Sequence, residues 1–234
     1  MADTADINKE RRVILVEITP ERLLIAAKQL FGKTIGELDT YGWLSESKNK
    51  GAIGQIVEMA LTGQQRNNSP EPDLPGTEIK VTGLKKLKNG AFAVRDRLVL
   101  TNFNPSQIVQ EEFETSHVYA KSKYIFVIFY SIEKERKDCK IECATLFDLT
   151  QNEHYQDIKN DFYINQKKVK EGQAHLISGT TTKYLTTCQK QTKMQKQPFS
   201  DKLVKMRAWA FSRRFVQQYI FMACDNVDEK GNIY

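Results

Sequence analysis

The chain has 234 residues and a formal net charge of +6, and 40% of its residues are hydrophobic. This length fits one large domain or two small ones, and the hydrophobic fraction is enough for a packed core. No apolar run approaches the roughly 18 residues needed to span a bilayer, and the N-terminus lacks the apolar core of a signal peptide. We therefore expect a cytoplasmic protein with no membrane partner.

Positive charge is concentrated in residues 183–214. This segment contains nine Lys or Arg against a single acidic residue, Asp201, so the rest of the chain is slightly acidic. Such a concentration suggests a surface for a polyanion, because contacts of Lys and Arg with phosphate groups release counterions. The alternative is a solvated basic face without a specific partner, since runs of charge are common.

The cysteines and histidines do not form a metal-binding pattern. Cys139 and Cys143 are the only close pair of cysteines, and no histidine stands near them at the spacing of a zinc ligand. We interpret all four cysteines as reduced thiols. The three histidines are interpreted as ordinary polar residues rather than as ligands or bases: His117, His154 and His175.

The first elements in chain order are a short apolar run at 13–18 and a helix. Thr19 is a typical N-cap, Pro20 is a typical first helical residue, and Gly32 is suited to end the helix. The apolar residues of this helix form one buried stripe: Leu23, Leu24, Ala27, Leu30 and Phe31. The polar stretch 36–49 is predicted to be a loop.

A second helix is predicted over residues 50–61, and Gly63 closes it. Its apolar residues lie on a single face: Ile53, Ile56, Val57, Ala60 and Leu61. Glu58 lies next to this face. It is either a surface residue of the helix or, because it precedes Asp73 by 15 residues, a third carboxylate for the site described next.

Residues 72–82 read PDLPGTEIKVT and contain Asp73, Glu78 and Lys80. The second half of this stretch favours a strand, in which side chains alternate between the two faces. Glu78 and Lys80 then point one way, while the isoleucine and valine beside them point to a core. The Pro-Gly pair before the strand permits a turn that brings Asp73 back beside Glu78.

Two carboxylates and an ammonium group are the set that metal-assisted phosphodiester hydrolysis needs. Carboxylate oxygens hold Mg²⁺, the metal lowers the pKa of a bound water, and a lysine orients or deprotonates that water. The alternative is an exposed strand edge with a surface ion pair. A looser version of the pattern, Asp39 followed by Glu46 and Lys48, lacks strand-forming neighbours and is interpreted as a solvated loop.

The run KKLKNG at 85–90 ends in Asn-Gly, which is the strongest short signal for a hairpin. A second strand is therefore predicted to return antiparallel from Phe92 to Phe103. The remaining predicted elements are strands at 124–131 and 140–146 and helices at 152–171 and 207–223. Because the chain shows no repeat, low-complexity segment or linker, we expect one α/β domain over residues 1–234.

Five separated segments together resemble the MutH family of GATC-specific DNA endonucleases. They are GAIGQIVE at 51–58, DLPGTEIK at 73–80, FETSHVYAK at 113–121, YLTTCQK at 184–190 and AFSRR at 210–214. Within the family, the chain looks most like the N-terminal catalytic domain of GATC-cutting type II restriction endonucleases, whose chains carry two MutH-like domains. The resemblance implies a restriction-endonuclease-like (PD-(D/E)XK) fold, in which a mixed sheet flanked by helices forms two lobes around a DNA cleft.

The resemblance also implies catalytic roles. Asp73 and Glu78 would bind one or two Mg²⁺ ions, and Glu58 would support the metal site as a further carboxylate. Lys80 would act on the attacking water. Lys121 matches a lysine near the catalytic centre of the family, where it would position the nucleophile or neutralise the scissile phosphate.

The basic segment corresponds to the base-reading region of the family. Lys190 matches a lysine there, and a long cation suits the guanine O6 and N7 acceptors in the major groove. The other residues expected to contact DNA are Lys183, Phe211, Arg213, Arg214, Lys86 and Lys88. Cys188 and Phe211 stand where MutH itself has an arginine and a tyrosine, and both look like the restriction-enzyme branch.

Our leading hypothesis is a Mg²⁺-dependent type II endonuclease, or its catalytic domain, that hydrolyses duplex DNA at GATC. A two-stranded cut requires a homodimer on the palindrome or sequential nicking, and the resemblance allows a second MutH-like domain in the natural chain. The first alternative is a MutH-type mismatch-repair nickase, against which Cys188 and Phe211 argue. The second is a GATC-binding or allosteric module that does not cut, against which the intact set of acidic residues argues.

Overall fold

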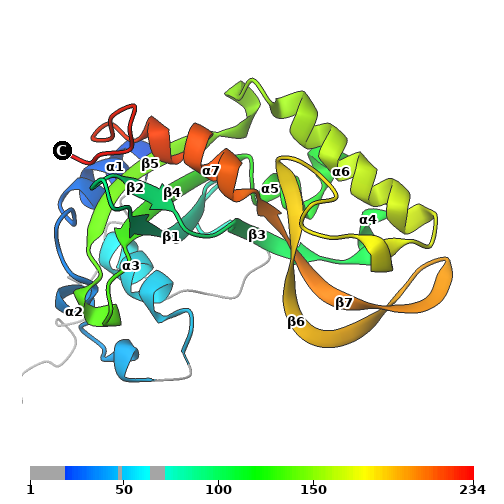
Figure 1. The fold of residues 1–234 in the computed structure, drawn as a ribbon, viewed down its shortest axis with the longest axis horizontal. Coiled ribbons are helices and arrows are strands. Elements are labelled where there is room, and N and C mark those ends of the chain that lie inside the picture. The colour runs from blue at the N-terminus through cyan, green and yellow to red at the C-terminus, as the bar shows by residue number, and fades with distance from the viewer. Residues whose placement is uncertain (1–18, 47–48, 64–71) are drawn as a thin grey trace, which may run out of the picture.

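The structure is a computed structural model that describes residues 19–46, 49–63 and 72–234. The apolar run predicted at 13–18 lies outside these residues. Two β-sheets lie next to each other, one of four strands and one of three (Figure 1). The mixed α/β architecture expected from the sequence is confirmed.

The larger sheet is mixed. Its strands, in spatial order, are β2 (Phe92–Val94), β1 (Glu78–Lys86), β4 (Tyr124–Ser131) and β5 (Ile141–Asp148). β1 runs parallel to β4, and the other neighbours are antiparallel. The centre of β4, Ile125–Phe129, is completely buried, as expected for a strand that is covered on both faces.

Helices pack on one face of this sheet: α1 (Pro20–Lys28), α2 (Ile35–Leu38) and α3 (Ala52–Thr62). Ile79 of β1 and Phe126 of β4 belong to the hydrophobic cluster that these helices form. Val127 and Phe129 of β4 point to the opposite face, into a second cluster that extends to the smaller sheet. The period-two alternation of β4 therefore joins the two clusters of the core.

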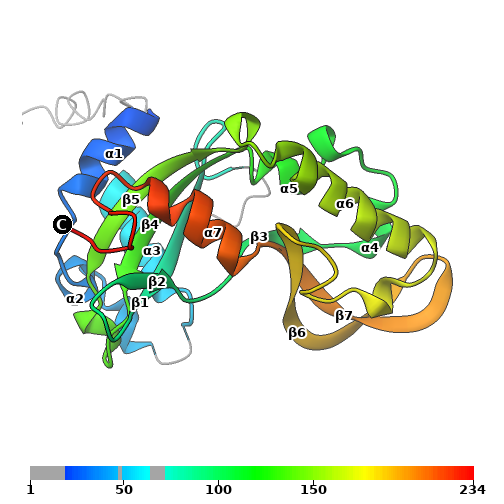
Figure 2. The ribbon, with the colours of Figure 1, turned by 45° about the horizontal axis from the view of Figure 1, so that its top comes forward.

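The smaller sheet is antiparallel, with the spatial order β3 (Leu98–Phe103), β7 (Ser200–Phe211) and β6 (Leu185–Gln197). Trp209 of β7 stacks on Phe162 of α6 (Tyr155–Lys170), with ring centroids 5.7 Å apart. Phe211 packs against Phe147 of β5. Beyond these contacts, β6 and β7 continue together as a long curved ribbon (Figure 2).

The remaining elements are short. They are the helices α4 (Pro105–Ile108), α5 (His117–Ala120) and α7 (Arg213–Tyr219) and the 3₁₀ helices Trp43–Ser45, Phe113–Thr115, Arg136–Asp138, Leu149–Gln151, Ala174–Leu176 and Phe221–Ala223. Phe113, just before α5, is completely buried. Glu114 accepts a hydrogen bond from Lys159 of α6 at 2.5 Å, which holds the pKa of Glu114 below its usual range. The segment leading into α5 is thereby fixed to α6.

Most predicted elements are confirmed. Thr19 caps α1 by accepting the backbone N–H of Arg22, and α3 ends at Gly63. β4 has the predicted bounds, while β5 and α6 differ from the prediction by a few residues at their ends. The Asn-Gly hairpin joins β1 to β2 and pairs Lys86 with Phe92.

The helix predicted at 207–223 is wrong in its first part. Residues up to Phe211 belong to β7, and α7 starts at Arg213, after Ser212 accepts the backbone N–H of Phe215. The cause lies far away in the sequence, because β7 is held by pairing with β6, a strand that the sequence analysis does not predict. The alternation Ala-Trp-Ala-Phe at 208–211 has the period of a strand, and this local signal agrees with the pairing.

Two smaller predictions also need correction. The strand predicted from Phe92 to Phe103 is interrupted, because β2 stops at Val94 and β3 starts at Leu98 in the other sheet. The loop predicted at 36–49 contains most of α2, which is stabilised by a capping box between Thr34 and Glu37.

No helix in the described part of the chain is both long and apolar enough to cross a membrane. All four cysteines are free thiols, as predicted. Asp39, part of the looser acidic pattern, accepts the backbone N–H groups of Trp43 and Leu44, both at 2.9 Å. Asp39 thus caps the 3₁₀ helix Trp43–Ser45, and within the described residues it is not part of an acidic group that could hold a metal ion. Lys48 of the looser pattern lies outside the described residues.

Candidate active site

The turn before β1 brings Asp73 against the strand. Leu74 and Thr77 exchange backbone hydrogen bonds of 3.0 and 3.1 Å, and Gly76 between them has a φ of +71°. A residue with a side chain is strained at this positive φ, so glycine suits the turn. Asp73 Oδ2 accepts the backbone N–H of Ile79 at 2.9 Å. The turn inferred from the sequence is therefore present, and the Asp73 carboxylate lies at the start of β1.

Glu78, the first residue of β1, lies between two lysines. Its Oε2 accepts a hydrogen bond from Lys121 Nζ at 2.8 Å, and its Oε1 accepts one from Lys80 Nζ. Glu78 is 2% exposed and Lys121 is 6% exposed. Because removing a carboxylate from water costs free energy unless it is paired, the two ammonium groups compensate for the burial of Glu78.

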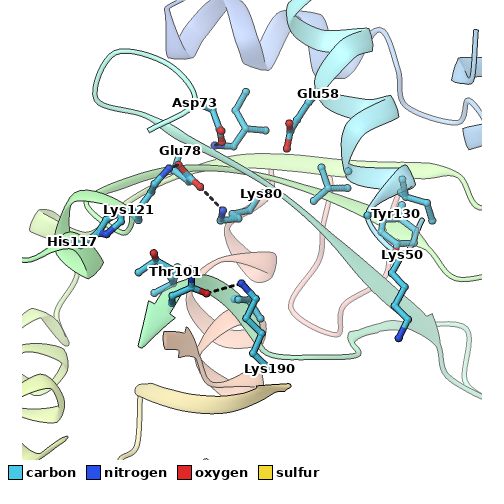
Figure 3. A pocket seen from close by; sticks show the side chains of 18 residues that line it. Lys50, Glu58, Asp73, Glu78, Lys80, Thr101, His117, Lys121, Tyr130 and Lys190 are labelled. Carbon is cyan, nitrogen blue, oxygen red and sulfur yellow. Dashed lines mark hydrogen bonds and ion pairs between the residues drawn. The ribbon is translucent and has the colours of Figure 1, made fainter. Parts of the chain in front are cut away.

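These side chains line a cavity of about 640 Å³ between the two sheets (Figure 3). The lining includes all five residues predicted to be catalytic: Glu58, Asp73, Glu78, Lys80 and Lys121. The opposite wall comprises Thr101 and Asn102 of β3 and Lys190 of β6. The structure therefore brings the acidic motif and one residue of the basic segment to the same place.

Glu58 belongs to the cavity and not to the solvent-exposed side of α3. It is 6% exposed, which excludes its interpretation as a surface helix residue. Figure 3 shows its carboxylate directed toward the space that Asp73 and Lys80 also face. It does not complete a group of three ligands, because within residues 19–46, 49–63 and 72–234 no three His, Cys, Asp or Glu side chains are grouped to hold a metal ion.

The donor set nevertheless fits a hard divalent cation. Asp73 and Glu78 supply carboxylate oxygens, and Mg²⁺ is commonly bound by one or two carboxylates together with several waters. Both Glu78 oxygens accept hydrogen bonds from ammonium groups, so a cation bound here competes with one lysine for an oxygen.

Lys190 reaches the cavity because β6 bulges. Gln189 pairs with Arg207 and Met194 pairs with Lys205, so residues 190–193 have too few partners on β7 and leave the regular ribbon. The Lys190 Nζ donates a hydrogen bond to Asn102 Oδ1 on β3 at 2.6 Å, which Figure 3 marks with a dashed line. The bulge thus places an ammonium group on the wall opposite Glu78.

The other residues predicted to contact DNA lie outside this cavity. They are Lys86 and Lys88 at the β1–β2 hairpin, Lys183 before β6, Phe211 at the end of β7, and Arg213 and Arg214 at the start of α7. Arg213 and Arg214 line a second cavity of about 380 Å³ together with Lys85. Phe211 is completely buried, so a contact of its ring with a base would require the core to rearrange.

Sequence reasoning missed several residues of the active-site cavity: Lys50, Thr101, Asn102, His117 and Tyr130. His117 stands four residues before Lys121, on the same side of α5, and this spacing is the one local signal that relates it to the site. Burial raises the pKa of Tyr130. Thr101 and Asn102 of β3 can be assigned to the cavity only when the β3–β7 pairing is known.

Comparison with known proteins relates part of this chain to a known family. Residues 62–161 match the family model of the DNA mismatch repair enzyme MutH. The matched segment contains Asp73, Glu78, Lys80 and Lys121, so the chain is similar to the MutH family over the stretch that holds the acidic motif.

The similarity to one relative extends beyond the segment that matches the family model. The chain is 32% identical over 207 residues to the type II restriction enzyme Sau3AI of Staphylococcus aureus, which covers 85% of this chain and 42% of that protein. The chain therefore spans less than half the length of this relative. A solved restriction endonuclease MvaI–cognate DNA substrate complex overlaps 85% of this chain and 93% of its own, with a TM-score of 0.37 and 14% identity, and we draw no conclusion from it.

Replacing Lys121 tests how far the buried carboxylate depends on its partners. Lys121→Met keeps the length of the side chain but deletes the ammonium group, so Glu78 keeps Lys80 alone. We expect the free energy of unfolding to fall by about 2 kcal/mol, less than the roughly 3 to 5 kcal/mol for a fully broken buried pair.

A double-mutant cycle provides the control. Glu78→Gln combined with Lys121→Met removes both charges of this pair, so the double variant should lose less stability than the sum of the single variants. The measurement is urea unfolding of the four proteins. Strict additivity would mean that Glu78 and Lys121 are not coupled.

Proposed function

We propose that this chain is the catalytic part of a Mg²⁺-dependent type II restriction endonuclease that hydrolyses duplex DNA at GATC. The observation that carries the proposal is Glu78, buried between Lys80 and Lys121 and beside Asp73, in one cavity with Lys190. The MutH match over the segment that holds the acidic motif supports it. The similarity to a type II restriction enzyme supports it as well.

The side chains divide the reaction into separate tasks. Negative charge grows on the phosphate in the transition state, so Lys80 and Lys121 lower its energy when the scissile phosphate lies beside them. Lys80 also orients the attacking water by donating a hydrogen bond to its oxygen, and the proton of the water passes to solvent. Asp73 and Glu78 would hold Mg²⁺, which would lower the pKa of the attacking water and stabilise charge on the phosphate. In-line attack by the water leaves a 5′-phosphate.

The wall of the cavity opposite Glu78, which includes Lys190, recognises the DNA sequence in this proposal. Lys190 is suited to donate hydrogen bonds to guanine O6 and N7, because its ammonium group has three donors and only one is directed at Asn102. A palindromic site needs two cuts, so we propose that two copies act on it or that one copy nicks the strands in turn. The greater length of the relative is compatible with a second MutH-like domain in the natural protein.

A mismatch-repair nickase is the second candidate function. It is favoured by the family model itself, which describes a mismatch repair enzyme. In that case the chain would cut one strand only and would depend on partner proteins.

The test is incubation of the protein with Mg²⁺ and three matched duplexes that contain unmethylated, hemimethylated or fully adenine-methylated GATC, with each strand labelled separately. We expect cleavage of both strands in all three duplexes and none in a duplex without GATC. Nicking confined to the unmethylated strand would favour the repair nickase instead. Specific binding without cleavage would contradict the proposal and favour a recognition module.

Replacing Glu78 separates catalysis from binding. Glu78→Ala removes a proposed metal ligand but no group of the opposite wall, so we expect cleavage to fall by about a thousandfold or more, the order of effect seen when a group that stabilises transition-state charge is lost. Affinity for the GATC duplex, measured without divalent cations, should change little. Glu133→Ala, at an exposed residue outside the cavity, is the matched control. An equal loss of binding would make Glu78 a structural residue.

Replacing Lys190 tests base reading. Lys190→Ala should weaken discrimination between GATC and a site with the guanine replaced by about 1 to 3 kcal/mol. Lys193→Ala removes the same charge from the same bulge and should weaken binding to all duplexes alike. The measurement is affinity for cognate and substituted duplexes at one salt concentration. A uniform loss with Lys190→Ala would mean that Lys190 contacts a phosphate.

A further inference from the structure

One face of the smaller sheet continues from the active-site cavity. Trp209 and Phe211 of β7 point into the core, so Ala208 and Ala210 point to the opposite face. Asn102 is the partner of Ala208 on β3, and it lines the active-site cavity. The side of the sheet that carries the two alanines therefore adjoins the cavity at Asn102, while Ala208 and Ala210 themselves are buried.

Arg97 reaches this face from the connection between β2 and β3. Its Nη2 donates a hydrogen bond to the carbonyl oxygen of Gly179, on the loop before β6, at 3.4 Å. Cys188 pairs with Ala208 and so lies on the same face. Burial raises the pKa of the Cys188 thiol, while the charges of Arg97 and Lys190 act in the opposite direction. Lys190 stands two residues after Cys188 on β6, next to this face.

Gly179 leaves the space that the Arg97 guanidinium occupies. A Cβ at this position would lie 2.7 Å from Arg97 Nη2 and 3.1 Å from the carbonyl oxygen of Thr187. The first distance is shorter than a Cβ contact permits, and the second contact is with backbone that cannot move away freely. A side chain at position 179 would therefore displace the Arg97 guanidinium from its position beside the loop.

The loop around Gly179 carries further donors of the kind that bind phosphate. The hydroxyl groups of Ser178 and Thr180 lie 2.9 Å apart, and the Gly179 N–H has no hydrogen-bond partner within the described part of the chain. Among the same residues, no carboxylate pairs with Arg97. Phosphate groups of DNA are bound mostly by arginine and lysine, by hydroxyl side chains and by backbone N–H groups.

We propose that Arg97 and the loop 178–180 form a phosphate-binding subsite that holds the DNA backbone next to Lys190. The ligand is a phosphodiester of the substrate strand. The inference rests on the proposed function, because the substrate is duplex DNA in both. The subsite adds affinity and fixes the position of the duplex, but it does not distinguish one sequence from another.

The experiment compares two variants of the subsite with one control. Arg97→Ala deletes the guanidinium, whereas Gly179→Ala keeps every charge and only displaces it. Arg95→Ala is the matched control, because Arg95 is exposed, carries the same charge two residues away and is paired with Asp96 at 2.7 Å. Affinity for a GATC duplex and for a duplex without the site is measured without divalent cations over a range of salt concentrations. Thermal unfolding shows that each variant is folded.

We expect Arg97→Ala to weaken binding to both duplexes by about tenfold at low salt, the loss of one charged hydrogen bond. The slope of log affinity against log salt should become shallower by about 0.9, the value for one phosphate contact. Gly179→Ala should change the slope in the same direction although the net charge is unchanged. Arg95→Ala should leave the slope as in the wild type.

The other possible outcomes contradict the subsite, the proposed function or both. If the salt dependence of affinity is the same for Arg97→Ala as for Arg95→Ala, the proposed subsite is wrong. If Arg97→Ala weakens binding to the GATC duplex alone, the subsite is also wrong and Arg97 reads a base. A wild type that binds duplex DNA but never cuts it with Mg²⁺ contradicts the proposed function while the slopes still decide the subsite. A wild type that does not bind duplex DNA overturns both.

Discussion

Glu78 accepts hydrogen bonds from Lys80 on its own strand and from Lys121, 43 residues further along the chain. A carboxylate this deeply buried requires cationic partners, so the fold must hold α5 against the start of β1. α5 is too short to be stable alone. Its position comes from Phe113, which is buried in the core, and from Glu114, which is bound to Lys159 of α6. The long helix α6 therefore supports the active site without contributing a side chain to it.

The interruption of the strand after β2 produces the second wall of the cavity. If the strand that follows the hairpin had continued, β3 would have extended the larger sheet next to β1. Instead, residues 95–97 carry the chain to the smaller sheet, where β3 pairs with β7 and faces β1 across the cavity. Residues proposed to cut DNA stand on one wall and residues proposed to recognise it stand on the other. A substrate that fills this cavity contacts both walls, so in the proposed function recognition and hydrolysis depend on the same fit.

Local signals in the sequence predict the parts of the fold that local interactions determine. The cap at Thr19, the hairpin at Asn89-Gly90 and the alternation of β1 around Glu78 all appear in the structure because each depends on neighbouring residues. The acidic motif is recognisable for the same reason, since Asp73 and Glu78 are joined by a short turn. Lys121 belongs to the site through a contact between distant segments, and only the resemblance to MutH indicates it before the structure is known.

The errors have a common physical origin. β6 and β7 are specified by pairing with each other and by burial of Trp209, and the many lysines of the ribbon hide the alternation that marks a strand. Glu58 has two interpretations in the sequence because a residue beside an apolar face is buried or exposed according to what α3 packs on. The resemblance to MutH led us to expect Phe211 to contact DNA, yet its ring is in the core. Position along a motif does not determine which face of a strand a side chain occupies when the neighbouring elements differ.

The distribution of positive charge leads to a related conclusion. The density of Lys and Arg at 183–214 predicts a polyanion surface, but among these residues Lys190 alone lines the active-site cavity in the described part of the chain. It does so because the ribbon bulges at that point. Arg97 lies outside the basic segment, yet its guanidinium donates a hydrogen bond to the carbonyl oxygen of Gly179, on the loop before β6. Which cation meets a base, a phosphate or only solvent is therefore decided by strand register and by the space that a glycine leaves, and not by the density of charge along the sequence.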